Sequence, residues 1–555
     1  MTDIPQLREK QVEQLAFYIR NPKCLDLSDP GTGKTPPCCV YAYMMWARGE
    51  RKTLWSMPKS LLKKNLKELC RFTEFQVSND KKYTPGDDVA IMRTDRAALT
   101  KDWTGPTIDS TRRVASWRLK DGTMTHEIKA AEGRKFWYSD GMGNALALRT
   151  GKPAGLAVGG PGWYQVDPLF GPDGVTPVKE YIDVPDTFKD LIAAYAADGV
   201  KAFICTYAFM SAHWERLLAA APNIDLLLVD ELHMGYGGLD SKQTESFYHV
   251  NRHVSRFVGM TGTLINGSLQ TAFPAIHVIE PRYYGGRRGF MFEHAALVDD
   301  YDRVIVWKNE DKLSKIIEKH SIRRTFEEVY GEEDVVFQTE YVEMDEKVRE
   351  KYDEFEEQAM LELEDGRVLD GTMAGVNQIR CRQLFSHPET MALGKIEKWT
   401  PKDERIIVHL SGGQKTLIFA SLQPEQERLQ RLCEELGLRV ALINGNVPGK
   451  AREAIDEAFQ RGELDVIVAS GPTVAVGYNW EAFDLVLFAS IDFMDVNILQ
   501  AYRRASRGSR TKTLYVVFLR YEDCKVEDRM YAIVTAKSQL ANRVDPTRRV
   551  LTFVQ

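Results

Sequence analysis

The 555-residue sequence predicts an α/β fold with two tandem parallel-sheet domains, a β-rich insertion and a helical linker region. Apolar runs typical of buried strands alternate with amphipathic helical stretches in both halves of the chain. This βαβα order favours parallel sheets covered by helices on both faces, and the length exceeds what one hydrophobic core supports. We expect a first domain at 1–281 with the insertion at about 95–185, a linker region at 282–400, a second domain at 401–525 and a C-terminal extension at 526–555.

Composition limits the classes of protein. The formal net charge is −6, so any binding of nucleic acid must depend on local basic patches. The chain has no long apolar run and begins with polar and charged residues, from which we expect no membrane span, no signal peptide and a cytoplasmic location. The eight cysteines and ten histidines lack metal-ligand spacing, which predicts free thiols and no structural zinc.

The first domain is organised around the segment 24–35. An apolar run, Cys24–Leu27, predicts a strand, and a glycine turn and an apolar helical run follow it. This order is typical of a loop that surrounds phosphates with backbone N–H groups at a helix N-terminus. Lys34 is expected to neutralise the β- and γ-phosphates of a nucleotide and the Thr35 hydroxyl to hold Mg²⁺. Ser28 departs from the full pattern, which has glycine there. The predicted cradle comprises Gly31, Thr32, Gly33, Lys34 and Thr35.

Gln11 and the Lys59–Ser60 pair flank this loop in the sequence, and each has two possible interpretations. Gln11 lies just upstream, where its amide could bind an adenine edge or could simply be a solvated residue at a helix start. Lys59 and Ser60 follow the strand predicted at Lys52–Met57. They suit a nucleic-acid phosphate or an ordinary capped helix.

The insertion at residues 95–185 is rich in glycine, tryptophan, tyrosine and proline. Its short alternating runs predict small strands and turns. Its aromatic side chains suit a small core better than base stacking.

A pair of acidic residues follows a second apolar strand of this domain. The strand Ile224–Val229 ends in Asp230 and Glu231, where hydrolysis of a magnesium nucleotide requires carboxylates. Asp230 would hold the metal through water, and Glu231 would orient or deprotonate the attacking water. His233 is expected to couple this site to the next strand, Arg256–Met260.

The second domain repeats the strand and helix pattern without a second phosphate loop. It should therefore complete the nucleotide site of the first. Gln500, Arg504 and Arg507 fall at i, i+4 and i+7, which predicts one shared helix face. Two guanidinium groups there would stabilise the charge on a transferring γ-phosphate. Arg503 is expected to point elsewhere, toward solvent or nucleic acid.

The order of these motifs resembles that of the superfamily-two helicases and translocases, and within them the Swi/Snf-type ATPases. Arg503 departs from this branch, which often has glycine or aspartate there, and the insertion has no counterpart. The absence of an attached chromatin-reading module favours a bacterial or bacteriophage source. The matching segments are Leu7–Gln11, Ser28–Thr35, Pro58–Ser60, Cys205–Tyr207, Asp230–His233, Thr261–Asn266, Ile322–Thr325, Arg382–Pro388, Gly477–Asn479 and Gln500–Arg507.

The resemblance implies two RecA-like domains that bind ATP and Mg²⁺ between them. It implies an ATP-dependent DNA helicase or translocase, acting on duplex or forked DNA as a monomer, with RNA left open. Alternatives are a remodeller of protein–DNA complexes or branched DNA, and the motor subunit of a restriction or defence complex. Further residues implied are Gln11 and Gly477 at the nucleotide, Gln500 in catalysis, and Lys59, Ser60, Thr206, Tyr207 and Ser470 on nucleic acid.

Overall fold

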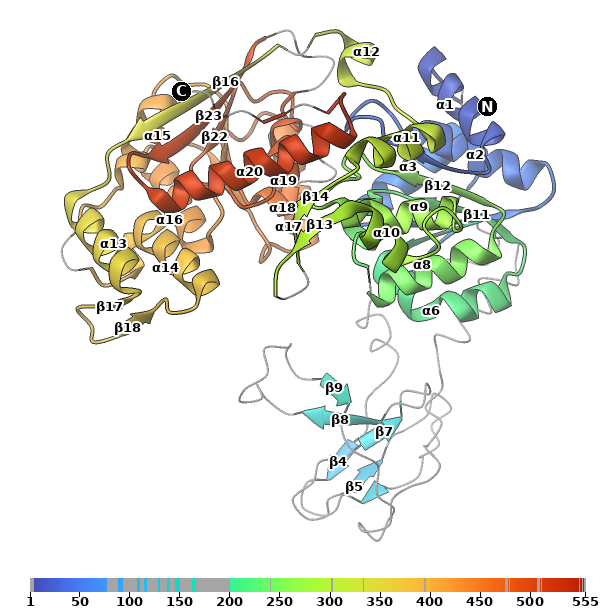
Figure 1. Cartoon of the computed structure of the whole chain (residues 1–555), viewed down its shortest axis with the longest axis horizontal. Coiled ribbons are helices and arrows are strands. Elements are labelled where there is room, and N and C mark those ends of the chain that lie inside the picture. Colours follow the sequence, from blue (N-terminus) through green and yellow to red (C-terminus); the bar gives the residue numbers. More distant parts are fainter. Residues whose placement is uncertain are drawn as a thin grey trace.

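The structure is a computed structural model of the chain, in which two α/β lobes are bridged by the long helix α20 (Figure 1). The described residues are 4–76, 88–92, 200–239, 241–300, 303–332, 334–393, 396–474, 478, 480–506, 510, 512–548, 550–551 and 553, together with six short strands between 107 and 165.

The first domain contains a parallel sheet of seven strands in the described part of the chain, in the order β15-β1-β12-β11-β2-β10-β3. The strands predicted for this domain are confirmed. Along β11, Leu226 and Leu228 face one hydrophobic core, and Leu227 and Val229 face the core on the opposite side of the sheet. Burial on both faces explains why these strands are continuous apolar runs. The bounds are β1 (Lys23–Asp26), β2 (Lys52–Met57), β3 (Val89–Met92), β10 (Ala202–Thr206), β11 (Ile224–Val229), β12 (Arg256–Met260) and β15 (Ser321–Ile322).

Helices cover both faces of this sheet. One face packs on α1 (Glu9–Arg20), α2 (Thr35–Ala47) and α3 (Leu62–Phe72). The other face packs on α6 (Tyr207–Ala220), α7 (Leu232–Tyr236), α8 (Lys242–His253), α9 (Phe273–Ile279), α10 (Arg287–His294) and α11 (Glu310–His320).

The second domain contains a parallel sheet of six strands among the residues described, in the order β16-β23-β22-β19-β21-β20. Its predicted strands are likewise confirmed. The strands are β16 (Val335–Val342), β19 (Thr416–Phe419), β20 (Val440–Ile443), β21 (Val466–Ala469), β22 (Leu485–Phe488) and β23 (Leu514–Tyr521). The helices are α15 (Pro401–Leu410), α16 (Gln423–Glu435), α17 (Gly449–Gln460), α18 (Gly471–Val474), α19 (Asp495–Tyr502) and α20 (Lys525–Val544).

The linker region contains helices and also supplies one strand to each sheet, β15 to the first and β16 to the second. Besides α10 and α11, which pack on the first sheet, its described helices are α12 (Phe326–Tyr330), α13 (Glu346–Gln358) and α14 (Ala374–Ser386). Helix α13 ends at Gln358 because Ala359 adopts a left-handed conformation with φ 55°. Two antiparallel hairpins complete the region, β13 (Ala295–Val298) with β14 (Val304–Trp307) and β17 (Met360–Glu362) with β18 (Val368–Asp370).

The insertion is β-rich, as predicted. Its described strands form two antiparallel sheets, each of three strands. Their bounds are β4 (Thr107–Asp109), β5 (Val114–Ser116), β6 (Ile128–Lys129), β7 (Trp137–Ser139), β8 (Ala145–Arg149) and β9 (Gly162–Gln165). The aromatic side chains discussed above lie outside the described residues. Among the helices that the structure describes, none has the length and apolar character to cross a membrane.

Candidate active site

The predicted phosphate loop joins β1 to α2 in the first domain. Gly31 and Gly33 have φ values of 89° and 94°, which glycine adopts without steric cost. A Cβ at Gly33 would also lie 2.7 Å from the amide nitrogen of Gln11. Helix α2 then begins at Thr35 with two prolines in its first turn, where their missing N–H groups are not needed. The strand, the glycine turn and the helix therefore have the geometry that binds phosphate at a helix N-terminus.

Lys34 lies inside this loop. Its ammonium group donates to the backbone carbonyls of Ser28 at 2.6 Å and Asp29 at 3.1 Å. Ser28 is buried, and its hydroxyl accepts hydrogen bonds from the Arg324 backbone N–H at 3.0 Å and the Gln14 amide at 3.2 Å. The serine at the position expected for glycine thus ties the loop to the linker region.

Gln11 is buried against the loop. Its Oε1 accepts the Arg8 N–H at 3.0 Å, and its Nε2 donates to the Gly33 carbonyl at 3.1 Å. The alternative of a solvated glutamine is therefore wrong, because the side chain is only 6 % exposed. In this conformation the amide supports the loop.

The two carboxylates lie at the end of β11. Asp230 is buried and accepts a hydrogen bond from Asn65 Nδ2 at 2.8 Å; burial and the neighbouring Glu231 raise the pKa of Asp230 to about 6. Glu231 has a left-handed backbone, φ 47°. Its Oε2 is buried and has no hydrogen-bond partner among the described residues. Such an open acceptor suits a water molecule or a bound group.

His233 connects these acids to the end of β12, as the sequence suggested. Its Nδ1 lies 2.7 Å from the Thr261 hydroxyl, 3.2 Å from the Thr263 hydroxyl and 3.6 Å from Glu231 Oε2. Burial and the positive charges of Arg548 and Lys34 lower the pKa of His233 to about 3, so the ring is neutral near pH 7.

Arginine side chains connect the two domains. Arg503 Nη2 lies 3.3 Å from the Asp29 carboxylate of the phosphate loop. The expectation that Arg503 points to solvent or nucleic acid is therefore wrong for this conformation. Arg548, in the C-terminal extension, donates to the Ile265 carbonyl of the first domain at 2.6 Å and to Asp495 of the second at 2.5 Å.

The prediction that Gln500, Arg504 and Arg507 share one helix face is wrong for the described residues. Helix α19 ends at Tyr502, and Arg504 lies in the following turn. The Arg504 N–H donates to the Ala501 carbonyl, three residues back, and the Arg504 carbonyl accepts the Trp480 N–H at 2.8 Å. This tertiary hydrogen bond replaces a further helical turn. Gln500 and Arg504 are both buried. Arg507 and Gly477 lie outside the described residues.

The residues predicted to contact nucleic acid fall into two groups. Lys59 and Ser60 are exposed at the start of a short 3₁₀ helix, and the Thr206 side chain caps α6 by accepting the Phe209 N–H. Tyr207 is buried instead, and its hydroxyl donates to the backbone carbonyls of Asp230 and Glu231. We revise its role from nucleic-acid contact to support of the acidic strand end.

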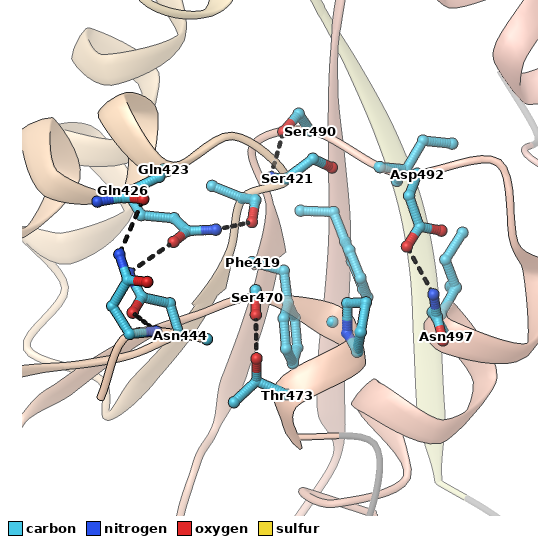
Figure 2. A pocket seen from close by; sticks show the side chains of 18 residues that line it. Phe419, Ser421, Gln423, Gln426, Asn444, Ser470, Thr473, Ser490, Asp492 and Asn497 are labelled. Atoms are coloured by element: carbon cyan, nitrogen blue, oxygen red, sulfur yellow. Dashed lines mark hydrogen bonds between the residues drawn. The ribbon is translucent and has the colours of Figure 1, made fainter. Parts of the chain in front are cut away.

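Ser470 lines a cavity of about 350 Å³ at the carboxyl edge of the second sheet (Figure 2). Among the described residues of its lining, Asp492 is the one charged side chain. Its other polar side chains are amides and hydroxyls, as in the contact of Asn444 Nδ2 with Gln426 Oε1 at 3.1 Å. The lining comprises Phe419, Ala420, Ser421, Gln423, Gln426, Asn444, Gly445, Asn446, Ser470, Gly471, Pro472, Thr473, Phe488, Ser490, Ile491, Asp492, Asn497 and Ile498.

The cavity and the exposed Lys59–Ser60 pair flank a contact between the domains. Lys63, one turn after Ser60 on α3, pairs with Glu453 on α17 at 2.8 Å. Helix α17 itself follows Asn446 of the cavity. The ion pair therefore joins the helix that follows Ser60 to the helix that follows the cavity residue Asn446.

Comparison with known proteins identifies the second domain. Residues 401–509 match the helicase conserved C-terminal domain. A chromodomain-helicase-DNA-binding protein 1-like of Danio rerio is 25% identical over 339 residues, which cover 58% of this chain and 32% of the relative. The second domain is therefore similar to the C-terminal domain of helicases, and the longer match extends the similarity to Swi/Snf-like superfamily-two helicases over more than half of the chain.

Other relatives cover shorter segments. The Mus musculus protein of the same name is 32% identical over 142 residues, 25% of this chain and 16% of the relative. The ATP-dependent RNA helicase RhlB of Xanthomonas campestris is 31% identical over 96 residues, 16% of this chain and 17% of the relative. The chain therefore spans about a third or less of the length of these curated relatives. A solved Sulfolobus solfataricus SWI2/SNF2 ATPase core in complex with dsDNA aligns over 100% of this chain and 98% of that one, with 14% identity and a TM-score of 0.35.

Proposed function

We propose that this helicase-family chain is a nucleic-acid-dependent ATPase that couples hydrolysis to movement along DNA, with duplex DNA as the favoured track. The observation that carries the proposal is the set of charged residues at the interface between the two domains. There Arg503 of the second domain lies 3.3 Å from the Asp29 carboxylate of the phosphate loop, and the positive charge of Lys34 in the same loop acts on the buried Asp230.

The residues present fit ATP and Mg²⁺. The glycine loop at the start of α2 suits a triphosphate, and Lys34 donates to loop carbonyls, from which it can turn to phosphate oxygens. Two adjacent carboxylates, the buried Asp230 and the partly buried Glu231, and the Thr35 hydroxyl suit a divalent cation, which would lower the pKa of Asp230 from its raised value near 6. When bound, the metal would neutralise charge on the phosphates.

Glu231 has the best position for the base. Its Oε2 is open within the described part of the chain, while the two backbone carbonyls beside it are held by Tyr207. Glu231 would accept the proton of the attacking water, and Asp230 would hold the metal. Arg504 and Arg507 would stabilise the developing phosphate charge from the second domain. Closing and reopening of the interface between the domains would then move one domain along the DNA.

Nucleic acid would contact both domains on one side of the interface between them. Lys59, Ser60 and Thr206 of the first domain and Ser470 of the second suit phosphate oxygens. Because the cavity at Ser470 is lined by hydroxyls and amides, the second domain would bind by hydrogen bonds. The chromodomain relatives are named as DNA-binding helicases, which supports DNA as the partner.

The test compares ATP hydrolysis without nucleic acid and with duplex DNA, single-stranded DNA, forked DNA or RNA. We expect the highest rate with duplex DNA, and equal rates under all conditions would refute the proposal. Displacement of the third strand of a triplex measures translocation alone, whereas displacement of a duplex strand also requires unwinding. Comparison of these assays separates a translocase from a helicase.

The variant that tests the assignment of the phosphate loop is Lys34→Ala. Loss of its charge should lower kcat by about a hundredfold or more, because a preorganised positive group at the phosphates is removed. DNA affinity, measured by fluorescence anisotropy, should stay close to that of the wild type, since Lys34 lies inside the loop. Substantial turnover by this variant would contradict the assignment of the phosphate loop.

A further inference from the structure

Arg503 and Asp29 form an ion pair that joins the second domain to the phosphate loop. Arg503 Nη2 lies 3.3 Å from Asp29 Oδ2, and the two side chains are 12% and 10% exposed. The same carboxylate oxygen accepts the Phe326 backbone N–H at 3.1 Å. The Asp29 backbone carbonyl also accepts the Lys34 ammonium at 3.1 Å. The residue paired with Arg503 thus directly contacts the lysine of the loop.

An aspartate at this position poses an electrostatic problem for a site that binds polyphosphate. Its carboxylate repels the phosphates, and partial burial strengthens this repulsion compared with bulk water. Burial alone would raise the pKa of Asp29, but the Arg503 guanidinium, the Phe326 N–H and, with a smaller effect, the Arg323 guanidinium together outweigh it, so this pKa lies below the ordinary value. Asp29 is therefore ionised near neutral pH and needs a cationic partner.

Arg503 supplies that positive charge at the end of α19. Its guanidinium joins the C-terminal end of this helix to the phosphate loop.

We infer that Arg503 is a positioning residue of the nucleotide site, which neutralises the Asp29 carboxylate so that the phosphate loop accepts the polyphosphate of a nucleotide. This inference rests on the proposed ATPase function. Arg503 acts through Asp29, whereas Arg504 and Arg507 remain the arginines proposed to face the γ-phosphate.

The experiment measures KM and kcat for ATP in the full chain with Arg503→Met, which removes the charge while keeping much of the volume. KM should rise about tenfold, since the Asp29 carboxylate in the phosphate loop then loses the neighbouring charge of Arg503, while kcat should change less than threefold. Arg503→Lys keeps the charge and should hold KM within about threefold of wild type.

Asp29→Asn provides the decisive comparison, because its side-chain oxygen can still accept the Phe326 N–H. Alone it should lower KM, and combined with Arg503→Met it should restore KM to within about threefold of wild type. Failure of the double variant to recover would overturn the inference in favour of direct phosphate contact by Arg503. A lowered melting temperature with unchanged KM would overturn it in favour of a purely structural pair.

The wild type and Lys34→Ala serve as references in the same assay. Absence of hydrolysis by the wild type would refute the proposed function itself. Hydrolysis that depends on Lys34, with a KM indifferent to Arg503, would refute only the role of Arg503.

Discussion

The two parallel-sheet domains share an architecture and differ in where they put their charges. In the first domain, Lys34, Asp230 and Glu231 gather at the carboxyl edge of the sheet, where Glu231 retains an open acceptor among the described residues. In the second, Lys402 and Glu527 form a buried pair at 2.6 Å. The cavity at that domain's carboxyl edge is lined by amides and hydroxyls.

This difference separates charged residues that are available for chemistry from charged residues that stabilise the fold. Charges that face an open site can act on a ligand, whereas buried and mutually satisfied charges hold helices together. Lys402 of α15 also donates to the Ala489 carbonyl at 3.0 Å, and Glu527 of α20 accepts the Tyr521 N–H at 2.6 Å. The same fold therefore carries the proposed catalytic groups at the sheet edge of one domain, and in the other a cavity whose described lining has Asp492 as its one charged side chain.

The largest expected effect on stability comes from breaking the buried pair. Lys402→Met should lower the unfolding free energy of the second domain by about 3–5 kcal/mol, because Glu527 is left as an uncompensated buried charge. Urea denaturation followed by circular dichroism measures this change. A matched control is Lys63→Ala, whose exposed pair with Glu453 should contribute less than about 1 kcal/mol. An equal loss of unfolding free energy in the two variants would contradict the contrast between a buried, stabilising ion pair and an exposed one.

A smaller effect, on DNA affinity, compares the basic residue Lys59 of the first domain with the uncharged residue Ser470 of the second. Lys59→Ala should weaken DNA binding and reduce the slope of log affinity against log salt by about 1, because one phosphate-neutralising cation is lost. Ser470→Ala should lower affinity by only about two- to fivefold and leave the slope unchanged, since a hydroxyl releases no counterion. Anisotropy titrations at several salt concentrations measure both. A slope change in Ser470→Ala would mean that the second domain binds phosphate by charge.

Local patterns predicted the parts of the site that are continuous in sequence. The strand, glycine turn and helix around Lys34 and the acids after β11 each occupy one short segment, whose geometry follows from glycine, proline and apolar runs. The edge strand β16 was missed because its residues alternate between exposed and half-buried, in contrast to the apolar runs of central strands.

Contacts between distant segments could not be predicted in the same way. Asn65 binds Asp230 from 165 positions away, and Arg548 reaches Ile265 across 283 positions. The early end of α19 depends on a hydrogen bond from Trp480, which no local helix rule contains. For Arg503 a clue was present, namely its departure from the family pattern, but its partner Asp29 emerged only from the fold.

The central claim is that the second domain completes the nucleotide site of the first. Its most direct test is single-turnover ATP hydrolysis by Arg504→Ala with duplex DNA, together with the affinity of this variant for a fluorescent ATP analogue. The account predicts a loss of hydrolysis of about a hundredfold or more, with the affinity changed less than about tenfold. Hydrolysis at the wild-type rate would contradict it.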